Sequence, residues 1–382
     1  MSFSSGSRQP ARATSQPSST STSAPLPQGH AKSSVHVVVR TRPSSFFAQD
    51  VIQFAPDRRT VNVHVAKNDA GFINNQPEDW AFHVDNIFHN ASQEALYQDA
   101  AFKIVQNALQ GINGTIIAYG QTGSGKTFTT MGTPDNFQQR GIIPRTIQHV
   151  FREMADKPHN AYTVRMSFLE IYNEQLYDLL ADSKRLDVGN ELHVPQDEHG
   201  RSSVTGLTVV PLRSEHQAFD AFFTGNANRT TAEHQMNAAS SRSHAVFTLL
   251  IEMRSKVESN EKITFSKLNI VDLAGSERLS ETQTSGRLLD EAKFINKSLT
   301  FLEQVIMALG ESRRGHVPFR QSRLTAVLRD ALGGNSETLL IANIHTERRY
   351  IDETISTLRF TSRMMKVTNS PAVNVQYDQA ML

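Results

Sequence analysis

The sequence predicts an α/β fold in which a central, mixed and mainly parallel sheet is covered by helices on both faces. Strand-like and helix-like patterns alternate between residues 35 and 365. The β-branched run at 35–40 is typical of a strand buried in the middle of a sheet. The apolar run at 115–119 leads into a glycine-rich loop and then a helix, a strand–loop–helix unit found in such folds.

The expected strands are apolar or alternating runs that are bounded by turn residues. Residues 61–65 alternate in polarity, as an exposed strand does. The patterns at 244–254 and 263–271 are joined by a polar turn around 258–260, which predicts a hairpin. The full set of expected strands is 35–40, 61–65, 80–84, 115–119, 162–172, 244–254, 263–271 and 339–344.

The expected helices have apolar residues three or four positions apart, so that one face of each is buried. Ser92 is placed to cap the first helix, and Gly333-Gly334 stops the fifth. Residues 182–211, with several glycines and prolines, are expected to form a loop-rich insertion or a small lobe. The expected helices are 92–109, 142–154, 214–224, 288–309, 323–332 and 352–365.

The composition is that of an ordinary globular protein, with 382 residues of which 38% are hydrophobic and 20% are charged. The absence of cysteine excludes disulfides, thiolate metal sites and cysteine nucleophiles. No apolar run approaches the roughly 18 residues of a membrane span, and no secretory signal is evident, so we expect a cytosolic protein. The net charge is +1, yet residues 312–329 hold five arginines and no acid, which favours an acidic partner at that face.

Residues 1–34 form an extension that is rich in Ser, Thr and Pro and contains no acidic residue. Such a segment buries too little apolar surface to offset its ordering entropy, so we expect it to be disordered. An organelle transit peptide is the alternative, because those are also basic and Ser-rich. Scattered prolines and the lack of an amphipathic stripe argue against that alternative.

The loop after residue 119 fits Gly-x-x-x-x-Gly-Lys-[Ser/Thr], whose glycines let backbone N–H groups approach a polyphosphate. Lys126 is expected to reach the β- and γ-phosphates, and the Thr127 hydroxyl to ligate Mg²⁺. A structural glycine turn is the alternative, but the apolar run before the loop is the context that nucleotide binding requires. The loop consists of Gly120, Gln121, Thr122, Gly123, Ser124, Gly125, Lys126 and Thr127.

Two further segments suit a phosphate site. Asp272 ends an apolar strand, where its carboxylate can hold Mg²⁺ through water, and Gly275 can offer a backbone N–H to the γ-phosphate. Residues 237–244 are rich in hydroxyl, amide and guanidinium donors. Alone, the first segment could be a strand-end turn and the second a surface loop that caps a helix. The phosphate loop favours the functional interpretation of both.

These segments, in this order, strongly resemble the kinesin motor domain. The motifs that carry the resemblance are Asn-x-x-Ser-Ser-Arg-Ser-His at 237–244 and Asp-Leu-Ala-Gly-Ser-Glu at 272–277. Arg-Thr-Arg-Pro at 40–43, Asn-Lys-Ser-Leu at 296–299 and residues 316–325 and 353–360 also look like kinesin, and the resemblance covers 35 to the C-terminus. Residues 301–304, 318–322 and 362–378 look like the ninth kinesin class, which is associated with cilia and flagella.

The resemblance implies an ATP hydrolase with the P-loop NTPase kinesin motor fold, using ATP/ADP and Mg²⁺. The adenine would be bracketed by Arg40, Arg42, Pro43 and Phe128, and Mg²⁺ would be held by Thr127, Ser241 and, through water, Asp272. The γ-phosphate would be sensed by Asn237 and Gly275, and the attacking water placed by Ser240. An ion pair between Arg242 and Glu277 would close with ATP and relay a proton from that water.

The resemblance also implies binding to microtubules and a segment that couples ATP hydrolysis to movement. Tubulin is acidic, and the expected microtubule-binding residues are Lys293, Lys297, Arg313, Arg314, Arg320 and Arg323. After a motor domain at 35–366, residues 367–382 resemble the neck linker and start of the neck, which suggests plus-end movement. No heptad repeat follows, so we expect a monomeric fragment of a longer protein that dimerises through a C-terminal coiled coil. Nucleic acid and membrane are not expected as partners, and the expected location is the cytoplasm, the cytoskeleton and the ciliary or flagellar axoneme.

Three rival interpretations are weaker. A small GTPase shares the phosphate loop, but the segment Asn296-Lys297-Ser298-Leu299 lacks the acidic residue that would recognise guanine. Myosin responds to its nucleotide through similar loops, but its motor domain is much longer. Its loop that corresponds to residues 237–244 does not end in Ser-His. A microtubule-binding protein that lost hydrolysis is disfavoured by the intact site residues. Ala118 and Ala245 stand where kinesins often carry cysteine, which leaves open whether cysteines were replaced.

Overall fold

The computed structural model describes most of the chain from residue 32 to residue 377. The described residues are 32–65, 78–133, 136–181, 192–195, 202–235, 240–257, 262–277, 287–311 and 315–377. Within them, only the backbone is described for 78, 231–235, 240 and 287–296.

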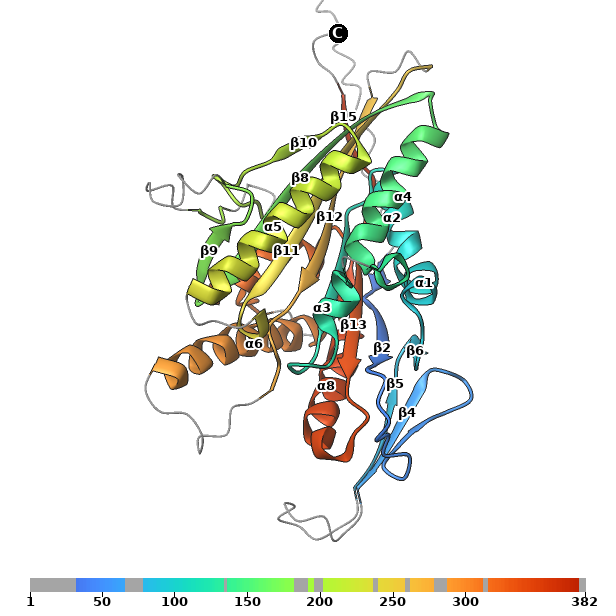
Figure 1. Cartoon of the computed structure of the whole chain (residues 1–382), viewed down its shortest axis with the longest axis vertical. Coiled ribbons are helices and arrows are strands. Elements are labelled where there is room, and N and C mark those ends of the chain that lie inside the picture. The colour runs from blue at the N-terminus through green and yellow to red at the C-terminus, as the bar shows by residue number, and fades with distance from the viewer. Residues whose placement is uncertain are drawn as a thin grey trace, which may run out of the picture. The chain divides into compact units, whose positions relative to one another are not determined.

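A mixed sheet forms the centre of the described part (Figure 1). Its strands follow the order β10 (Val210–Leu212), β8 (Asn160–Tyr172), β11 (His244–Ser255), β12 (Lys262–Asp272), β7 (Gly114–Tyr119), β13 (Glu337–Ile344), β2 (His36–Thr41) and β6 (Asn86–Phe88). β9 (Gln175–Asp178) pairs with β8, and β15 (Asn374–Tyr377) pairs with β12. The sheet is mixed, as predicted, but "mainly parallel" holds only from β12 to β6, because β10, β8, β11 and β12 pair antiparallel.

Both faces of the sheet are covered, as the alternation of strands and helices predicted. Successive residues of the strands enter different apolar clusters, so Ile116 belongs to one core and Ile117 to the other. One core includes side chains of α6 (Arg287–Gly310), α7 (Arg323–Val327) and α8 (Ile351–Met364). The other includes side chains of α1 (Gln93–Leu96), α2 (Phe102–Ala108), α4 (Ile142–Asp156) and α5 (Glu215–Gln235). The central strand β7 is buried along its whole length.

Two of the expected helices differ from the structure for identifiable reasons. The helix expected at 214–224 continues to Gln235, past Gly225. A Cβ at Gly225 would lie 2.6 Å from Cδ1 of Phe168, so this glycine allows a close approach of helix and strand rather than ending the helix. The helix expected at 323–332 ends at Val327, and a 3₁₀ turn follows at Arg329–Ala331. The carbonyl of Ala331 accepts hydrogen bonds from Thr338 and Asn369 instead of continuing the helix.

The remaining elements agree with their patterns. The helix expected at 92–109 is found as α1 and α2, joined by a π-turn at Tyr97–Ala101. Ser92 caps α1 by accepting a hydrogen bond from the Ala95 amide. The strand expected at 61–65 is β4 (Thr60–Val65), which forms a separate sheet with β3 (Ile52–Phe54) and β5 (Glu78–His83). The expected hairpin is confirmed by the antiparallel register of β11 and β12.

Both ends of the described chain join the core. Ser33–Ser34 forms β1, which pairs with β14 (Thr368–Asn369) just after α8. From there the chain returns along the sheet, and β15 pairs antiparallel with β12. Of the expected insertion at 182–211, the structure describes 192–195 and 202–211, where His193 bridges Thr205. Among the described residues, no helix is both long and apolar enough to cross a bilayer.

Candidate active site

The phosphate loop connects β7 to α3 (Lys126–Thr130), as the motif predicts. Gly120, Gly123 and Gly125 have φ angles of 143°, 77° and 101°, a region that only glycine adopts without strain. A Cβ at Gly120 would also clash with the carbonyl oxygen of Asn343 at the end of β13. The glycine spacing therefore reflects both the turn of the loop and its close packing against the sheet.

A cavity of about 800 Å³ lies beside this loop. Its lining contains almost every residue that the sequence predicted for nucleotide contact. The lining residues from that prediction are Arg40, Arg42, Pro43, Thr122, Gly123, Ser124, Gly125, Lys126, Thr127, Phe128 and Ser241. Gly120 and Gln121 lie behind it, where their carbonyl oxygens each accept a hydrogen bond of 2.9 Å from Nζ of Lys126.

One wall of the cavity is built by Arg40 and Phe128. The guanidinium carbon of Arg40 lies 5.4 Å from the centre of the Phe128 ring. Arg40 is buried, and its Nη1 donates to Gln93 Oε1 and Thr129 Oγ1, each at 2.8 Å. Burial lowers the pKa of Arg40 to about 10. Arg40 therefore supports the wall from inside, while Phe128 is 39% exposed and faces the cavity.

Gln93 is a wall residue that the sequence analysis missed. Its side-chain amide donates to the carbonyl oxygens of Phe128, at 2.6 Å, and Gln139, at 3.2 Å. It thereby ties α1 to the start of α3 and to the segment beyond it. No local pattern marks it, because its partners lie more than thirty positions away.

Lys126 is buried at the base of the cavity and is 6% exposed. Burial lowers the pKa of its ammonium group, whereas the charges of Asp272 and Glu277 raise it. The ammonium donates to two backbone carbonyls of the loop. A polyphosphate in the cavity would offer this buried cation stronger, charged acceptors.

The residues predicted to hold Mg²⁺ lie beside one another. Thr127 Oγ1 donates to Asp272 Oδ2 at 2.8 Å, and Ser241 lines the same cavity. Asp272 is 3% exposed, and its Oδ1 atom is buried without a hydrogen-bond partner. This carboxylate oxygen, which lacks a hydrogen-bond partner and lies near hydroxyl groups, fits a hydrated Mg²⁺. Mg²⁺ prefers oxygen ligands and keeps several waters.

Arg229 on α5 is a second residue that the sequence analysis missed. Its Nη1 donates to Asp272 Oδ2 at 3.1 Å, and its Nε lies 3.8 Å from Glu170 Oε1. These side chains are almost fully buried, and burial raises the pKa of Glu170, opposed by a Ser243 hydrogen bond and by the charge of Arg229. The guanidinium therefore orients the carboxylate of Asp272, which is predicted to help hold Mg²⁺. Its contacts span 43 and 59 positions, so no motif contains them.

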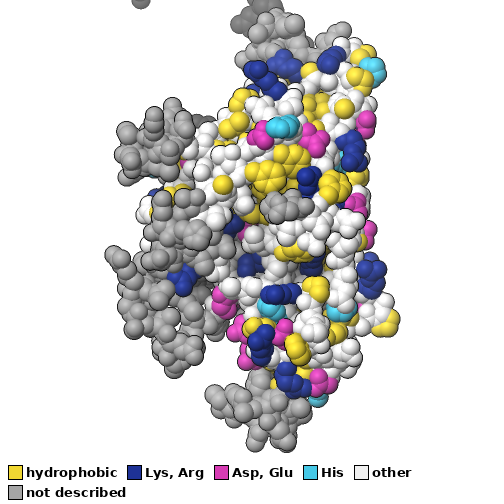
Figure 2. Space-filling model, viewed as in Figure 1, with side chains coloured by type: hydrophobic (Ala, Val, Ile, Leu, Met, Phe, Trp, Pro, Cys, Tyr) yellow, Lys and Arg dark blue, Asp and Glu magenta, His cyan; other side chains and the backbone are white. Residues whose placement is uncertain are grey.

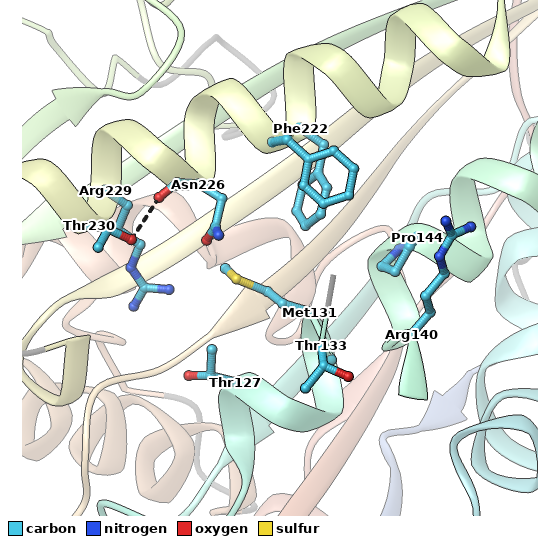
Figure 3. A pocket seen from close by; sticks show the side chains of 11 residues that line it. Thr127, Met131, Thr133, Arg140, Pro144, Phe222, Asn226, Arg229 and Thr230 are labelled. Carbon is cyan, nitrogen blue, oxygen red and sulfur yellow. Dashed lines mark hydrogen bonds between the residues drawn. The ribbon is translucent and has the colours of Figure 1, made fainter. Parts of the chain in front are cut away.

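Arg229 also borders a smaller pocket of about 180 Å³, which opens next to Thr127 (Figure 3). The side chain of Met131 extends into this region from the end of α3, and that of Phe222 from α5 (Figure 3). Beside them the guanidinium of Arg140 lies over the rings of Phe137 and Phe219, each at 5.0 Å. Phe137 and Phe223 are exposed in this region, and hydrophobic side chains gather on this face of the molecule in the space-filling view (Figure 2).

The loop after β12 lies directly against the phosphate loop. The Gly275 amide donates to the Ser241 carbonyl at 2.8 Å, and the Ser276 amide donates to the Gly120 carbonyl at 3.1 Å. Glu277 accepts hydrogen bonds from the Thr122 amide, at 2.7 Å, and from its hydroxyl. A Cβ at Gly275 would displace the side chains of Thr122 and Glu277, so a larger residue there would disturb their contact. Glu277 is thus held by Thr122, and its ion pair with Arg242 stays a prediction.

His244 links this loop to the long helix α6. Its Nδ1 accepts a hydrogen bond of 3.0 Å from the Ala274 amide, and its Nε2 lies 2.8 Å from Ser298 Oγ. Complete burial, reinforced by the charges of Arg229 and Lys126, lowers its pKa to about 3. The ring is therefore neutral at pH 7, with Nε2 as the donor. The contact joins the nucleotide side of the molecule to the helix that carries Lys297.

Some of the predicted residues cannot be placed. Asn237, Arg313 and Arg314 lie outside the described residues, and Ser240 and Lys293 are described by their backbone alone. Lys297, Arg320 and Arg323 are all exposed. Arg320 and Arg323 border a surface cavity of about 570 Å³, together with Glu174 and Val194.

Comparison with known proteins identifies the family. The family model "Kinesin motor domain" matches residues 39–367. Kinesin-like protein KIF9 of Mus musculus is 48% identical over 346 residues, which are 90% of this chain and 44% of that protein. Kinesin-like protein KLP1 of Chlamydomonas reinhardtii is 49% identical over 352 residues, which are 92% of this chain and 45% of that protein. The chain thus spans less than half the length of these relatives.

A solved structure, described as that of a fast kinesin, has the same fold. The two superimpose with a TM-score of 0.78 at 35% identity, over 91% of this chain and 96% of that one. The predicted fold class is therefore confirmed, and the similarity to KIF9 agrees with the predicted ninth class. The chain belongs to the kinesin motor domain family, as an ATP hydrolase of the microtubule motor class.

Proposed function

We propose that this motor domain binds ATP with Mg²⁺, hydrolyses it faster when bound to a microtubule, and converts each cycle into movement along the microtubule. The observation that carries the proposal is the meeting of three segments. The phosphate loop and Ser241 line one cavity, and the loop from Asp272 to Glu277 hydrogen-bonds to both of them. The third segment is tied through His244 to α6, which belongs to the predicted microtubule face.

In this proposal the site residues position the reactants and stabilise charge. Arg40, Arg42, Pro43 and Phe128 enclose the adenine, and Lys126 neutralises phosphate charge. Thr127, Ser241 and Asp272 would hold Mg²⁺, which would supply positive charge to offset that of the phosphates. Arg229 donates to Asp272 and orients its carboxylate for that task.

The proposed chemical step uses the remaining predicted residues. Asn237 and the Gly275 amide sense the γ-phosphate, and Ser240 orients the attacking water. Glu277 leaves Thr122, pairs with Arg242 and accepts the proton of that water. The movement of Glu277 between two partners would make hydrolysis depend on the closure of the loop.

The proposed microtubule face comprises α6, α7 and the segment between them. Its predicted cations are Lys293, Lys297, Arg313, Arg314, Arg320 and Arg323. The exposure of Lys297, Arg320 and Arg323 supports this assignment, since cations that bind an acidic surface must be accessible.

Binding to microtubules should weaken steeply as salt increases, because the ion pairs are exposed and screened. Arg320→Ala and Arg323→Ala should each weaken binding by about two- to fivefold and flatten the salt dependence. Arg213→Ala, which removes an exposed arginine at the start of α5, is the matched control and should change neither. Co-sedimentation at a series of salt concentrations measures all four proteins, and a salt-independent affinity would show that the assignment is wrong.

We further propose that 35–366 is the motor domain and 367–382 the linker and start of the neck, which moves the chain toward the plus end. The pairing of β14 with β1 and of β15 with β12 of the central sheet supports a linker that can dock. Similarity to KIF9 and to the ninth class supports a location in the cytoplasm and cytoskeleton, at the ciliary or flagellar axoneme. The whole protein is proposed to dimerise through a C-terminal coiled coil, without nucleic acid or membrane as partners.

ATP turnover with and without microtubules tests the proposed function against a non-hydrolysing microtubule-binding protein. We expect weak basal turnover that microtubules stimulate, and a preference for ATP over GTP. Binding to microtubules without any turnover would favour the rival function.

A further inference from the structure

The chain places a histidine behind the phosphate loop that belongs to none of the motifs above. His345 directly follows β13, which lies parallel to β7 with Ala342 opposite Tyr119. This pairing brings the end of β13 next to the first residue of the phosphate loop. His345 is 5% exposed, so its ring is enclosed.

The ring of His345 faces the middle of the phosphate loop. Its Nε2 lies 3.7 Å from the position that a Cβ on Gly123 would take, and the ring donates a hydrogen bond to the backbone carbonyl of Thr122. Arg42 lies near the same position and donates to the carbonyl of Gly123. The segment Thr122–Gly123 is therefore fixed by two side chains that come from the ends of β2 and β13.

The same segment holds Glu277. The Thr122 amide donates to Glu277 Oε2 at 2.7 Å, and its hydroxyl donates to Oε1. The amide and the hydroxyl of Thr122 can hold a distant carboxylate only if Thr122 itself is fixed in place. The ring of His345 binds the carbonyl of Thr122, so it fixes from one end the residue that holds Glu277 with its amide and side chain.

His345 is itself held firmly. Its ring packs on the ring of Tyr350, with centres 4.3 Å apart and planes inclined by 35°. Its carbonyl accepts a hydrogen bond of 2.9 Å from Thr354 on α8. Burial, together with the charge of Arg42, lowers the pKa of His345, opposed by the hydrogen bond to Thr122, so the neutral ring is favoured at pH 7.

The geometry points to His345 as a positioning residue for ATP hydrolysis, which sets the orientation of the Thr122–Gly123 segment and, through Thr122, the resting place of Glu277. It touches neither the reacting atoms nor the cavity surface, and it acts through the loop that does. The inference rests on the ATP hydrolase activity of the family and adds to it a residue outside the predicted constellation.

Two substitutions of His345 separate positioning from packing. His345→Leu keeps a bulky side chain but removes the ring N–H, and His345→Gln keeps an N–H donor. We expect His345→Leu to raise KM for ATP and to lower microtubule-stimulated kcat, each by about three- to tenfold, the value of one hydrogen bond. His345→Gln should recover most of the loss in both constants.

The control is His216→Leu, the same change at a histidine that is 86% exposed on α5, and it should leave both constants unchanged. Thermal unfolding of all four proteins monitors packing. Wild-type KM and kcat in His345→Leu would overturn the inference, whatever its Tm. Equal losses in His345→Leu and His345→Gln would also overturn it, because a role in packing alone does not require an N–H donor.

Discussion

Replacing Glu277 by alanine should leave ATP binding close to that of the unchanged protein and lower microtubule-stimulated turnover by at least about a hundredfold. The reason is that Glu277 borders the nucleotide cavity through Thr122 and, in our proposal, accepts the proton of the attacking water. Fluorescent-nucleotide titration measures binding, and phosphate release measures turnover. Because binding uses the phosphate loop and turnover uses the carboxylate, the two measurements should separate.

The matched control for this variant is Glu153→Ala. Glu153 lies on α4, away from the cavity, and forms an ion pair with Lys157. Its replacement removes a carboxylate of the same length from the same chain and should leave turnover unchanged. Normal turnover in Glu277→Ala would show that another group accepts the proton.

Lys126→Ala should abolish productive ATP binding, with a loss of affinity of about a hundredfold, because a charged hydrogen bond to each of two phosphates is removed. The lysine is buried and pre-oriented by the carbonyls of Gly120 and Gln121, so no neighbouring cation can replace it without moving. Titration calorimetry with ATP measures the loss.

Lys256→Ala serves as its control, since this lysine is exposed and donates to the Pro158 carbonyl far from the cavity. Circular dichroism should show that Lys126→Ala keeps the fold, because its removal also relieves the cost of burying a cation. Unchanged ATP affinity in a folded Lys126→Ala protein would contradict the nucleotide site described above.

The phosphate loop and most strands could be predicted because their signals are local. Glycine spacing reflects a turn that needs positive φ, and apolar runs reflect strands buried on both faces. Gly225 shows the limit of such signals, because in isolation it indicates the end of a helix. In the fold it allows α5 to pack closely against Phe168.

The residues that sequence analysis missed are those whose role arises from tertiary contacts. Gln93, Arg229 and His345 belong to no motif, and each meets the site through partners far away in the chain. The balance of parallel and antiparallel pairing was also misjudged. Alternating strands and helices suggest parallel pairing, but β11 and β12 form an antiparallel hairpin. β11 also pairs antiparallel with β8, although β9, β10 and α5 lie between them in the chain.

The central claim is that nucleotide turnover at this cavity drives movement along microtubules. A gliding assay on polarity-marked microtubules tests it most directly, with the motor domain attached to the surface through its C-terminal end. We predict ATP-dependent gliding with the minus end leading, which corresponds to plus-end-directed movement, and no gliding by Glu277→Ala. Microtubules that bind but do not move in ATP would contradict the claim, and gliding with the plus end leading would contradict the proposed direction.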